Sequence, residues 1–124
     1  MRRVDYFSNI NDRRIKCELC PHECILSLNQ TGICNVRKNV DNKLIAQNYS
    51  KVVSLAIDPI EKKPLYHFYP SKKVLSVASF GCNFKCQWCQ NWTISQNKPS
   101  TKDLSFEELI RYMENKNLDM IAFT

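Results

Sequence analysis

The pattern of apolar and polar positions gives little regular structure at the start of the chain. Residues 1–16 show no apolar periodicity. This predicts an N-terminal arm without regular secondary structure that packs against the rest of the protein. Residues 36–42 are polar and turn-like. Within them, Asp41 and Asn42 are the residue types that favour a hairpin bend, so a tight turn is predicted there.

Two short apolar stretches in the middle of the chain predict strands. Residues 44–49 and 52–57 are rich in β-branched and aromatic residues and are too short for helices. We expect them to pair antiparallel with each other. Asp58 and Pro59 should end the second strand, because proline cannot continue a central ladder.

The last third of the chain predicts a strand, a helix and another strand. Residues 74–80 form an almost continuous apolar run, typical of a strand buried on both faces of a parallel sheet. Ser105 and Glu108 have the spacing of a capping box, which predicts that a helix starts there. Residues 118–123 form the next apolar run. This order predicts one βαβ unit, of right-handed connection.

Three cysteines follow the first of these strands. The stretch FGCNFKCQWCQNW, residues 80–92, spaces Cys82, Cys86 and Cys89 as CxxxCxxC. Three thiolates this close can bind one inorganic centre and leave a metal position open, as catalytic sites do. A structural zinc site would need a fourth ligand, and His67 is the nearby upstream candidate. A 4Fe-4S cluster with three irons on cysteine and the fourth exposed fits the spacing better.

Four further cysteines are concentrated near the N-terminus. Cys17, Cys20, Cys24 and Cys34 supply four thiolates, enough to saturate a tetrahedral zinc ion or to hold a complete 4Fe-4S cluster. Both are closed sites, which favours a structural or electron-relay role. His22 could replace one thiolate, but a flanking histidine that hydrogen-bonds to the site is the preferred interpretation. Spacing alone leaves zinc and iron open.

Composition and charge indicate the cellular compartment in which the protein works and the classes of partner that it binds. Seven cysteines is an odd number, which argues against a simple disulfide framework. The first 16 residues are charged and polar, and the longest apolar run is far too short to span a bilayer, so we expect a soluble, cytoplasmic protein that does not bind membranes. The net charge of +6 comes from scattered basic pairs without an RNA-binding signature, which disfavours nucleic acid as a partner.

These motifs resemble a known superfamily. The stretch GCNFKCQWCQNWTISQ, with DPIEKKPLYHFYP upstream of it, is similar to radical S-adenosylmethionine (SAM) enzymes of the type that activates pyruvate formate-lyase, and most similar to the radical SAM member of the AmmeMemoRadiSam group. The resemblance covers roughly residues 17–124. It implies that Cys82, Cys86 and Cys89 ligate a 4Fe-4S cluster, that Trp88 belongs to the cofactor-binding motif, and that the fourth iron binds SAM. Reduction would then cleave SAM to a 5'-deoxyadenosyl radical that abstracts hydrogen.

The resemblance also implies an architecture. The expected fold class is α/β: the start of a partial (β/α) barrel, represented by one βαβ unit and preceded by a small cysteine-rich region that contains β-structure. The expected divisions are an arm (1–16), a metal-binding segment (17–42), antiparallel strands with a loop that forms a site wall (43–73), and the βαβ unit with the cluster loop (74–124). Because a full barrel needs about 250 residues, we expect a truncated chain that has little or no activity alone.

Other interpretations stay open beside this one. Tyr66, Phe68 and Tyr69 in the wall loop are more simply explained as packing residues than as site residues. Trp88 and Trp92 could exclude water from the cluster and so tune its potential, and core packing explains them nearly as well. The resemblance implies a reductant of the flavodoxin or ferredoxin type, and a protein substrate such as a backbone glycine of a partner enzyme. The alternative function is a non-catalytic module that binds zinc or an iron–sulfur cluster, or a basic interaction domain.

Overall fold

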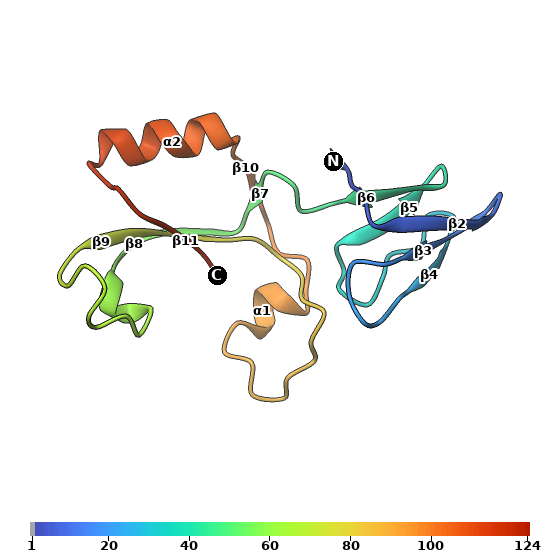
Figure 1. Cartoon of the computed structure of the whole chain (residues 1–124), viewed down its shortest axis with the longest axis horizontal. Helices are drawn as coiled ribbons and strands as arrows, with labels where there is room; N and C mark the ends of the chain where they lie inside the picture. Colours follow the sequence, from blue (N-terminus) through green and yellow to red (C-terminus); the bar gives the residue numbers. More distant parts are fainter. Residues whose placement is uncertain (1) are drawn as a thin grey trace.

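The computed structural model describes residues 2–124 and consists mainly of short strands (Figure 1). The strands are β1 (Arg2–Arg3), β2 (Phe7–Asn11), β3 (Arg14–Cys17), β4 (Ile25–Ser27), β5 (Arg37–Val40), β6 (Lys43–Ala46), β7 (Lys51–Val52), β8 (Ser54–Pro59), β9 (Lys73–Ala78), β10 (Lys102–Asp103) and β11 (Ile121–Phe123). The helices are α1 (Trp92–Ser95), α2 (Phe106–Asn115) and the 3₁₀ turn η1 (Ile60–Lys62).

The expected fold class, the start of an α/β barrel, is wrong. Strand accounts for 34% of the residues and helix for 14%, in several small and mainly antiparallel sheets. The expected strand–helix–strand order does occur, since β11 pairs parallel with β9 across α2. However, β9 also pairs antiparallel with β8 along six residue pairs, from Ser54 opposite Ala78 to Pro59 opposite Lys73. The central strand therefore belongs to a mixed three-stranded sheet.

The N-terminal part of the chain forms two three-stranded antiparallel sheets, which lie at the right of Figure 1. Their strand orders are β2-β3-β4 and β1-β6-β5. The segment expected to be an arm, residues 1–16, thus supplies β1, β2 and most of β3 in its described part. Between β5 and β6, Asp41 and Asn42 adopt φ values of 50° and 55°, which confirms the predicted hairpin turn. The sheets enclose a small core of Ile15, Cys17, Leu26 and Leu44.

The predicted pairing of residues 44–49 with 52–57 is also wrong. The first stretch contributes β6, which pairs with β5 and β1, and the second contributes β8, which pairs with β9. Residues 36–42, expected to be a polar turn, include β5. Pro59 ends β8 as predicted, because η1 begins at the next residue.

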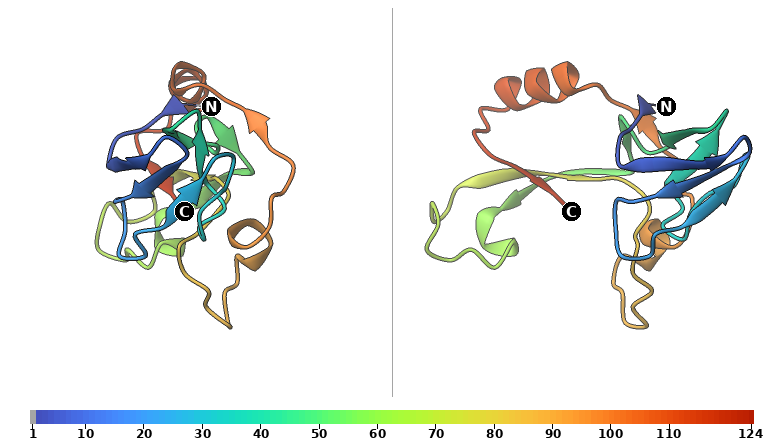
Figure 2. Two further views of the ribbon diagram at one scale, coloured as in Figure 1. Left: turned by 90° about the vertical axis from the view of Figure 1, so that its right-hand side faces the viewer. Right: turned by 45° about the vertical axis from the view of Figure 1, so that its right-hand side comes forward.

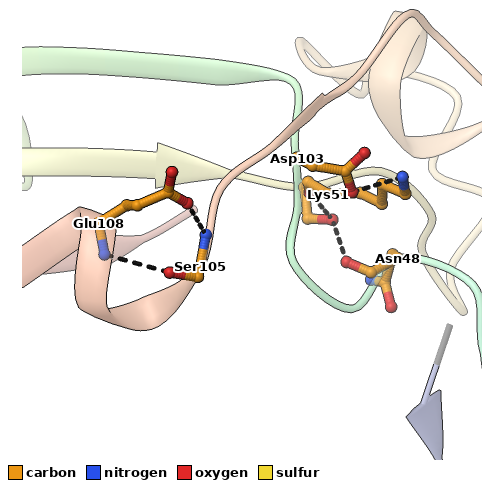
Figure 3. A network of polar contacts seen from close by, with 6 residues as sticks. Asn48, Lys51, Asp103, Ser105 and Glu108 are labelled. Carbon is orange, nitrogen blue, oxygen red and sulfur yellow. Dashed lines mark hydrogen bonds and ion pairs between the residues drawn. The ribbon is translucent and has the colours of Figure 1, made fainter.

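The sheet β11-β9-β8 carries α2 on one face, at the left of Figure 1. Leu75 and Val77 of β9 point to the same face because side chains alternate along a strand, and they pack with Leu109 of α2 and with Leu118. The predicted capping box is present: the Ser105 side chain accepts a hydrogen bond from the Glu108 N–H, and the Glu108 carboxylate accepts one from the Ser105 N–H (Figure 3). Just before this cap, Lys51 of β7 pairs with Asp103 of β10.

Neither α-helix among residues 2–124 has the length and apolar character needed to cross a bilayer.

Asp58 joins the end of β8 to the middle of β9. Its carboxylate accepts hydrogen bonds from Lys62 Nζ (2.8 Å) and from Ser76 Oγ (2.6 Å), and Lys63 Nζ lies 3.6 Å away. The hydrogen bond from Lys62, then that from Ser76, lowers the pKa of Asp58 below its ordinary value. A lowered pKa in the folded state means that this carboxylate stabilises the fold above the ordinary aspartate pKa of about 3.9, and that the contribution is lost as the pH falls through the lowered value.

We therefore expect Asp58→Asn to be less stable than the parent protein at neutral pH, with a difference that shrinks in acid. Denaturant unfolding at several pH values from neutral to below 4 would measure this. Asp119→Asn is the matched control, because Asp119 only pairs with Lys72 at 3.8 Å between exposed side chains. A stability difference for Asp58→Asn that grew as the pH fell would contradict the expected sign.

Candidate metal centre

The four N-terminal cysteines line one cavity, although they come from separate turns. Cys17 ends β3 and is buried, Cys20 and Cys24 lie in the connection to β4, and Cys34 precedes β5. The Cys17 N–H donates to the Cys24 carbonyl (2.9 Å), which closes the connection into a compact turn. The cavity has a volume of about 330 Å³ and is also lined by Cys82. We call it the cysteine pocket.

Cys17 is buried, whereas the other three N-terminal cysteines are half-buried. Burial raises the pKa of the Cys17 thiol above its ordinary value, and the backbone of Leu19 partly offsets this through a hydrogen bond. Negative charge on Cys20, Cys24 or Cys34 raises the pKa of Cys17 further. These sulfur atoms would therefore repel one another as thiolates unless a cation lay between them.

Cys82, Cys86 and Cys89 lie on an irregular loop, residues 81–91, that connects β9 to α1. We call this the cysteine loop; it extends beyond the sheets in both views of Figure 2. Cys82 lies at its start and faces the cysteine pocket, Cys86 is exposed, and Cys89 Sγ lies 3.5 Å from Ser95 Oγ of α1. The Cys89 N–H donates to the Cys86 carbonyl at 3.4 Å.

The structure does not gather either set of thiols around a single point. Among residues 2–124, no group of three His, Cys, Asp or Glu side chains stands in an arrangement that could hold a metal ion. All seven cysteines are free, in agreement with the prediction that they do not form a disulfide framework. Metal binding at either set would therefore involve movement of the thiols. The irregular backbone of the cysteine loop would allow that movement.

Gly81 is the residue that lets the chain leave β9 toward the pocket. It adopts φ = 91°, and a Cβ built on it would lie 2.6 Å from the Cys34 carbonyl oxygen and 2.1 Å from Val36 Cγ2. Only glycine fits both this backbone conformation and this close approach. Its N–H donates to the Ile94 carbonyl of α1 (2.9 Å), so the two ends of the cysteine loop are joined.

Gln96, directly after α1, fixes the middle of the cysteine loop. Its side-chain amide donates to the Phe84 carbonyl (2.8 Å), and its side-chain oxygen accepts a hydrogen bond from Lys85 Nζ (2.6 Å). Its backbone carbonyl accepts one from Asn35 Nδ2 (3.2 Å), next to Cys34. No sequence pattern predicts this role, because Gln96 is one glutamine within a polar stretch.

The two histidines occupy different places from those considered in the sequence. His22 Nε2 lies 2.8 Å from the Asn83 carbonyl oxygen, so this side chain contacts the cysteine loop backbone. His67 is exposed on the loop between η1 and β9 and does not line the cysteine pocket. Among residues 2–124 it forms no group with Cys82, Cys86 and Cys89 that could hold a metal ion.

The packing interpretation of the aromatic residues is wrong. Trp88 is 87% exposed and Trp92 is 59% exposed. Tyr66, Phe68 and Tyr69 are also exposed, and Phe68 and Tyr69 stack edge to face on each other. None of the five belongs to either core cluster.

Arg37 is a residue of the pocket that the sequence did not reveal. It lines the cysteine pocket, and its Nε and Nη1 atoms are buried without a hydrogen-bond partner among residues 2–124. Two buried guanidinium nitrogens without a partner are costly, which favours an anionic group close by. The only hint in the sequence is its position three residues after Cys34.

Comparison with known proteins gives one strong similarity. The chain is 43% identical over 127 aligned residues to a protein of Methanocaldococcus jannaschii, "Uncharacterized protein MJ0808". The alignment covers all of this chain and 38% of that protein, so the chain spans well under half the length of this relative. No family model matches the chain, and no solved structure matches it. The radical SAM resemblance therefore stays a prediction.

Proposed function

We propose that this chain binds a 4Fe-4S cluster through Cys82, Cys86 and Cys89 and serves a radical SAM enzyme of the activating type. The observation that carries the proposal is the CxxxCxxC spacing on one irregular loop that leaves a buried strand through Gly81. The donor set fits, because thiolates are the usual protein ligands of iron–sulfur clusters. The chemistry that such a cluster supplies when bound is the one-electron reductive cleavage of SAM.

The residues of this chain would position the centre and control access to it. Gly81, Gln96 and Ile94 hold the ends of the cysteine loop together, while Cys86 remains exposed. Exposure at Cys86 would leave the open side of a cluster accessible to SAM and to a reductant. Trp88 is free to fold over the centre and exclude water, which would tune its reduction potential.

The partners follow from the same proposal. A net charge of +6 favours docking of an acidic electron donor of the flavodoxin or ferredoxin type. The substrate would be a protein, with hydrogen abstracted from its backbone. The reduced cytoplasm would keep the seven thiols available for metal. Residues outside this chain would contribute to SAM binding, since the relative is much longer.

A second function is favoured by the position of Cys82. Because it lines the same cavity as the four N-terminal cysteines, four of these five thiols could bind one structural metal in a module without catalysis. In that case Cys86 and Cys89 would have no metal to bind.

Electron paramagnetic resonance (EPR) of the reduced, anaerobically reconstituted protein separates the two functions. We expect the signal of a reduced 4Fe-4S cluster that is altered by SAM. The matched control is adenosine, which lacks the amino and carboxylate groups with which SAM would bind the fourth iron. Absence of a cluster signal, or a signal that SAM never alters, would favour the module without catalysis.

A further inference from the structure

Three contacts join the turns that carry the pocket cysteines either to the cysteine loop itself or to Gln96, which holds the middle of the loop. His22, between Cys20 and Cys24, lies with its Nε2 atom 2.8 Å from the Asn83 carbonyl oxygen. Asn35, next to Cys34, donates to the Gln96 carbonyl (3.2 Å). The carbonyl of Cys34 itself packs against Gly81. Any movement of the pocket cysteines would therefore be transmitted directly to the loop.

Apart from these contacts, the N-terminal sheets have only a small core to hold the turns that carry the pocket cysteines in place. Their core consists of Ile15, Cys17, Leu26 and Leu44, and the strands around it are two to five residues long. Cores this small rarely stabilise a fold without a disulfide or a metal. All the cysteines are free, which leaves metal as the available cross-link. A metal bound by four thiolates contributes its binding energy directly to folding.

Charge in the pocket also favours a thiolate centre. A divalent ion bound by four thiolates carries a net charge of about −2, as does an oxidised 4Fe-4S cluster with four thiolate ligands. Arg37 is among the residues that line this cavity, and its Nε and Nη1 atoms are buried without a partner among residues 2–124. An anionic centre would give this guanidinium the counter-charge that the protein groups do not supply.

We propose that Cys17, Cys20, Cys24 and Cys34 hold one thiolate-bound metal centre, with Arg37 balancing its charge, and that this centre positions the cysteine loop through His22 and Asn35. Cys82 is not a ligand of this centre and remains with Cys86 and Cys89 in the cysteine loop. The centre is structural, because four thiolates leave no open metal position. This inference does not require the loop to bind a cluster, so it can fail or succeed separately from the proposed function.

The test uses the full chain with Cys82, Cys86 and Cys89 replaced by serine, so that only the four pocket thiols remain. The two tryptophans of the chain, Trp88 and Trp92, lie in the loop and at its end, so their emission reports on the loop alone. Zn²⁺ is titrated into the reduced, metal-free variant, and Co²⁺ in a parallel sample reports the number of thiolate ligands by its visible absorption. Iron with sulfide forms a second arm, which distinguishes a cluster from a single ion.

We expect one metal centre per chain, either in the zinc and cobalt titrations or in the reconstitution with iron and sulfide. The tryptophan emission should change and should reach its final value at the metal-to-protein ratio at which the centre is full. His22→Ala should keep the centre but lose most of the emission change, because it removes the contact with Asn83. His67→Ala is the matched control, since it removes the other histidine, which is exposed and distant in sequence from the pocket. It should respond like the parent variant.

Arg37 gives a second test that does not depend on the fluorescence change. Arg37→Gln should weaken metal binding about 10-fold or more, the scale found for residues that support metal ligands. Lys38→Gln removes the same charge from the next residue, whose side chain points to the opposite face of β5, and should change the affinity little. Circular dichroism of each metal-free variant checks that it remains folded like the parent.

Three results would overturn the proposal. The first is the absence of a stoichiometric centre in both arms. The second is metal binding without any change in tryptophan emission. The third is an equal emission change in His22→Ala and the parent variant.

Discussion

Replacing Gly81 with alanine is expected to lower the free energy of unfolding by about 2–4 kcal/mol. The added methyl group would lie 2.1 Å from Val36 Cγ2 and 2.6 Å from the Cys34 carbonyl oxygen, and φ = 91° is strained for any residue with a Cβ. The pocket wall would have to move away from the loop. Denaturant unfolding of the reduced, metal-free protein measures the loss.

Gly32, the only other glycine, provides the control for Gly81. A Cβ there would meet its neighbours at ordinary contact distances, 3.6 Å from Cys24 Sγ and 3.6 Å from the Arg37 carbonyl oxygen. Gly32→Ala should therefore be neutral, or stabilising by up to about 1 kcal/mol through the unfolded chain. Equal losses of stability in the two variants would contradict the close approach described at Gly81.

Replacing Cys86 with serine is expected to abolish the iron–sulfur signal of the reconstituted protein. Cys86 is the central ligand of the proposed site, and a cluster with two remaining thiolates would not be retained. The absorption of the reconstituted protein and its EPR spectrum after reduction measure the loss. Metal in the cysteine pocket should be unaffected, because Cys86 does not line that cavity.

Gln87→Ala is the matched control for Cys86→Ser. Gln87 is the next residue of the same loop and is exposed, so its replacement should leave the cluster signal unchanged. If Cys86→Ser removed all metal from the protein, the division into two separate sites would be wrong. If it left the iron content unchanged, Cys86 would not be a ligand.

Elements with strong local signals could be predicted from the sequence. The start of α2 follows from Ser105 and Glu108, which satisfy each other's backbone N–H groups within one turn. The β5–β6 hairpin follows from Asp41 and Asn42, which tolerate positive φ. In both cases the decisive contacts join residues close in sequence, so the pattern contains the information.

Strand pairing could not be predicted in the same way. Residues 52–57 were expected to pair with the preceding apolar stretch, but β8, residues 54–59, pairs with β9, and Asp58 contributes through a hydrogen bond from Ser76. Many strands of the N-terminal sheets have only two to four residues, too short for alternation to be recognised. The α/β fold class, which the resemblance implied, was wrong because most of the short strands pair antiparallel in several small sheets.

The same difference between local patterns and distant contacts applies to the candidate site. Cysteine spacing identified both sets of thiols, because chelation by short loops leaves a pattern in the sequence. The contacts between the sets join residues 61 positions apart, as for His22 with Asn83 and Asn35 with Gln96. Partners that distant leave no periodicity or motif, so only the structure could bring them together.

The most direct test of the proposed function is the iron, sulfide and zinc content per chain after anaerobic reconstitution. The account predicts about four irons and four sulfides held by the cysteine loop, in addition to the metal of the cysteine pocket. Cys86→Ser should lose those four irons and keep the pocket metal. Retention of zinc alone, with no iron, would contradict the account and leave a structural metal module.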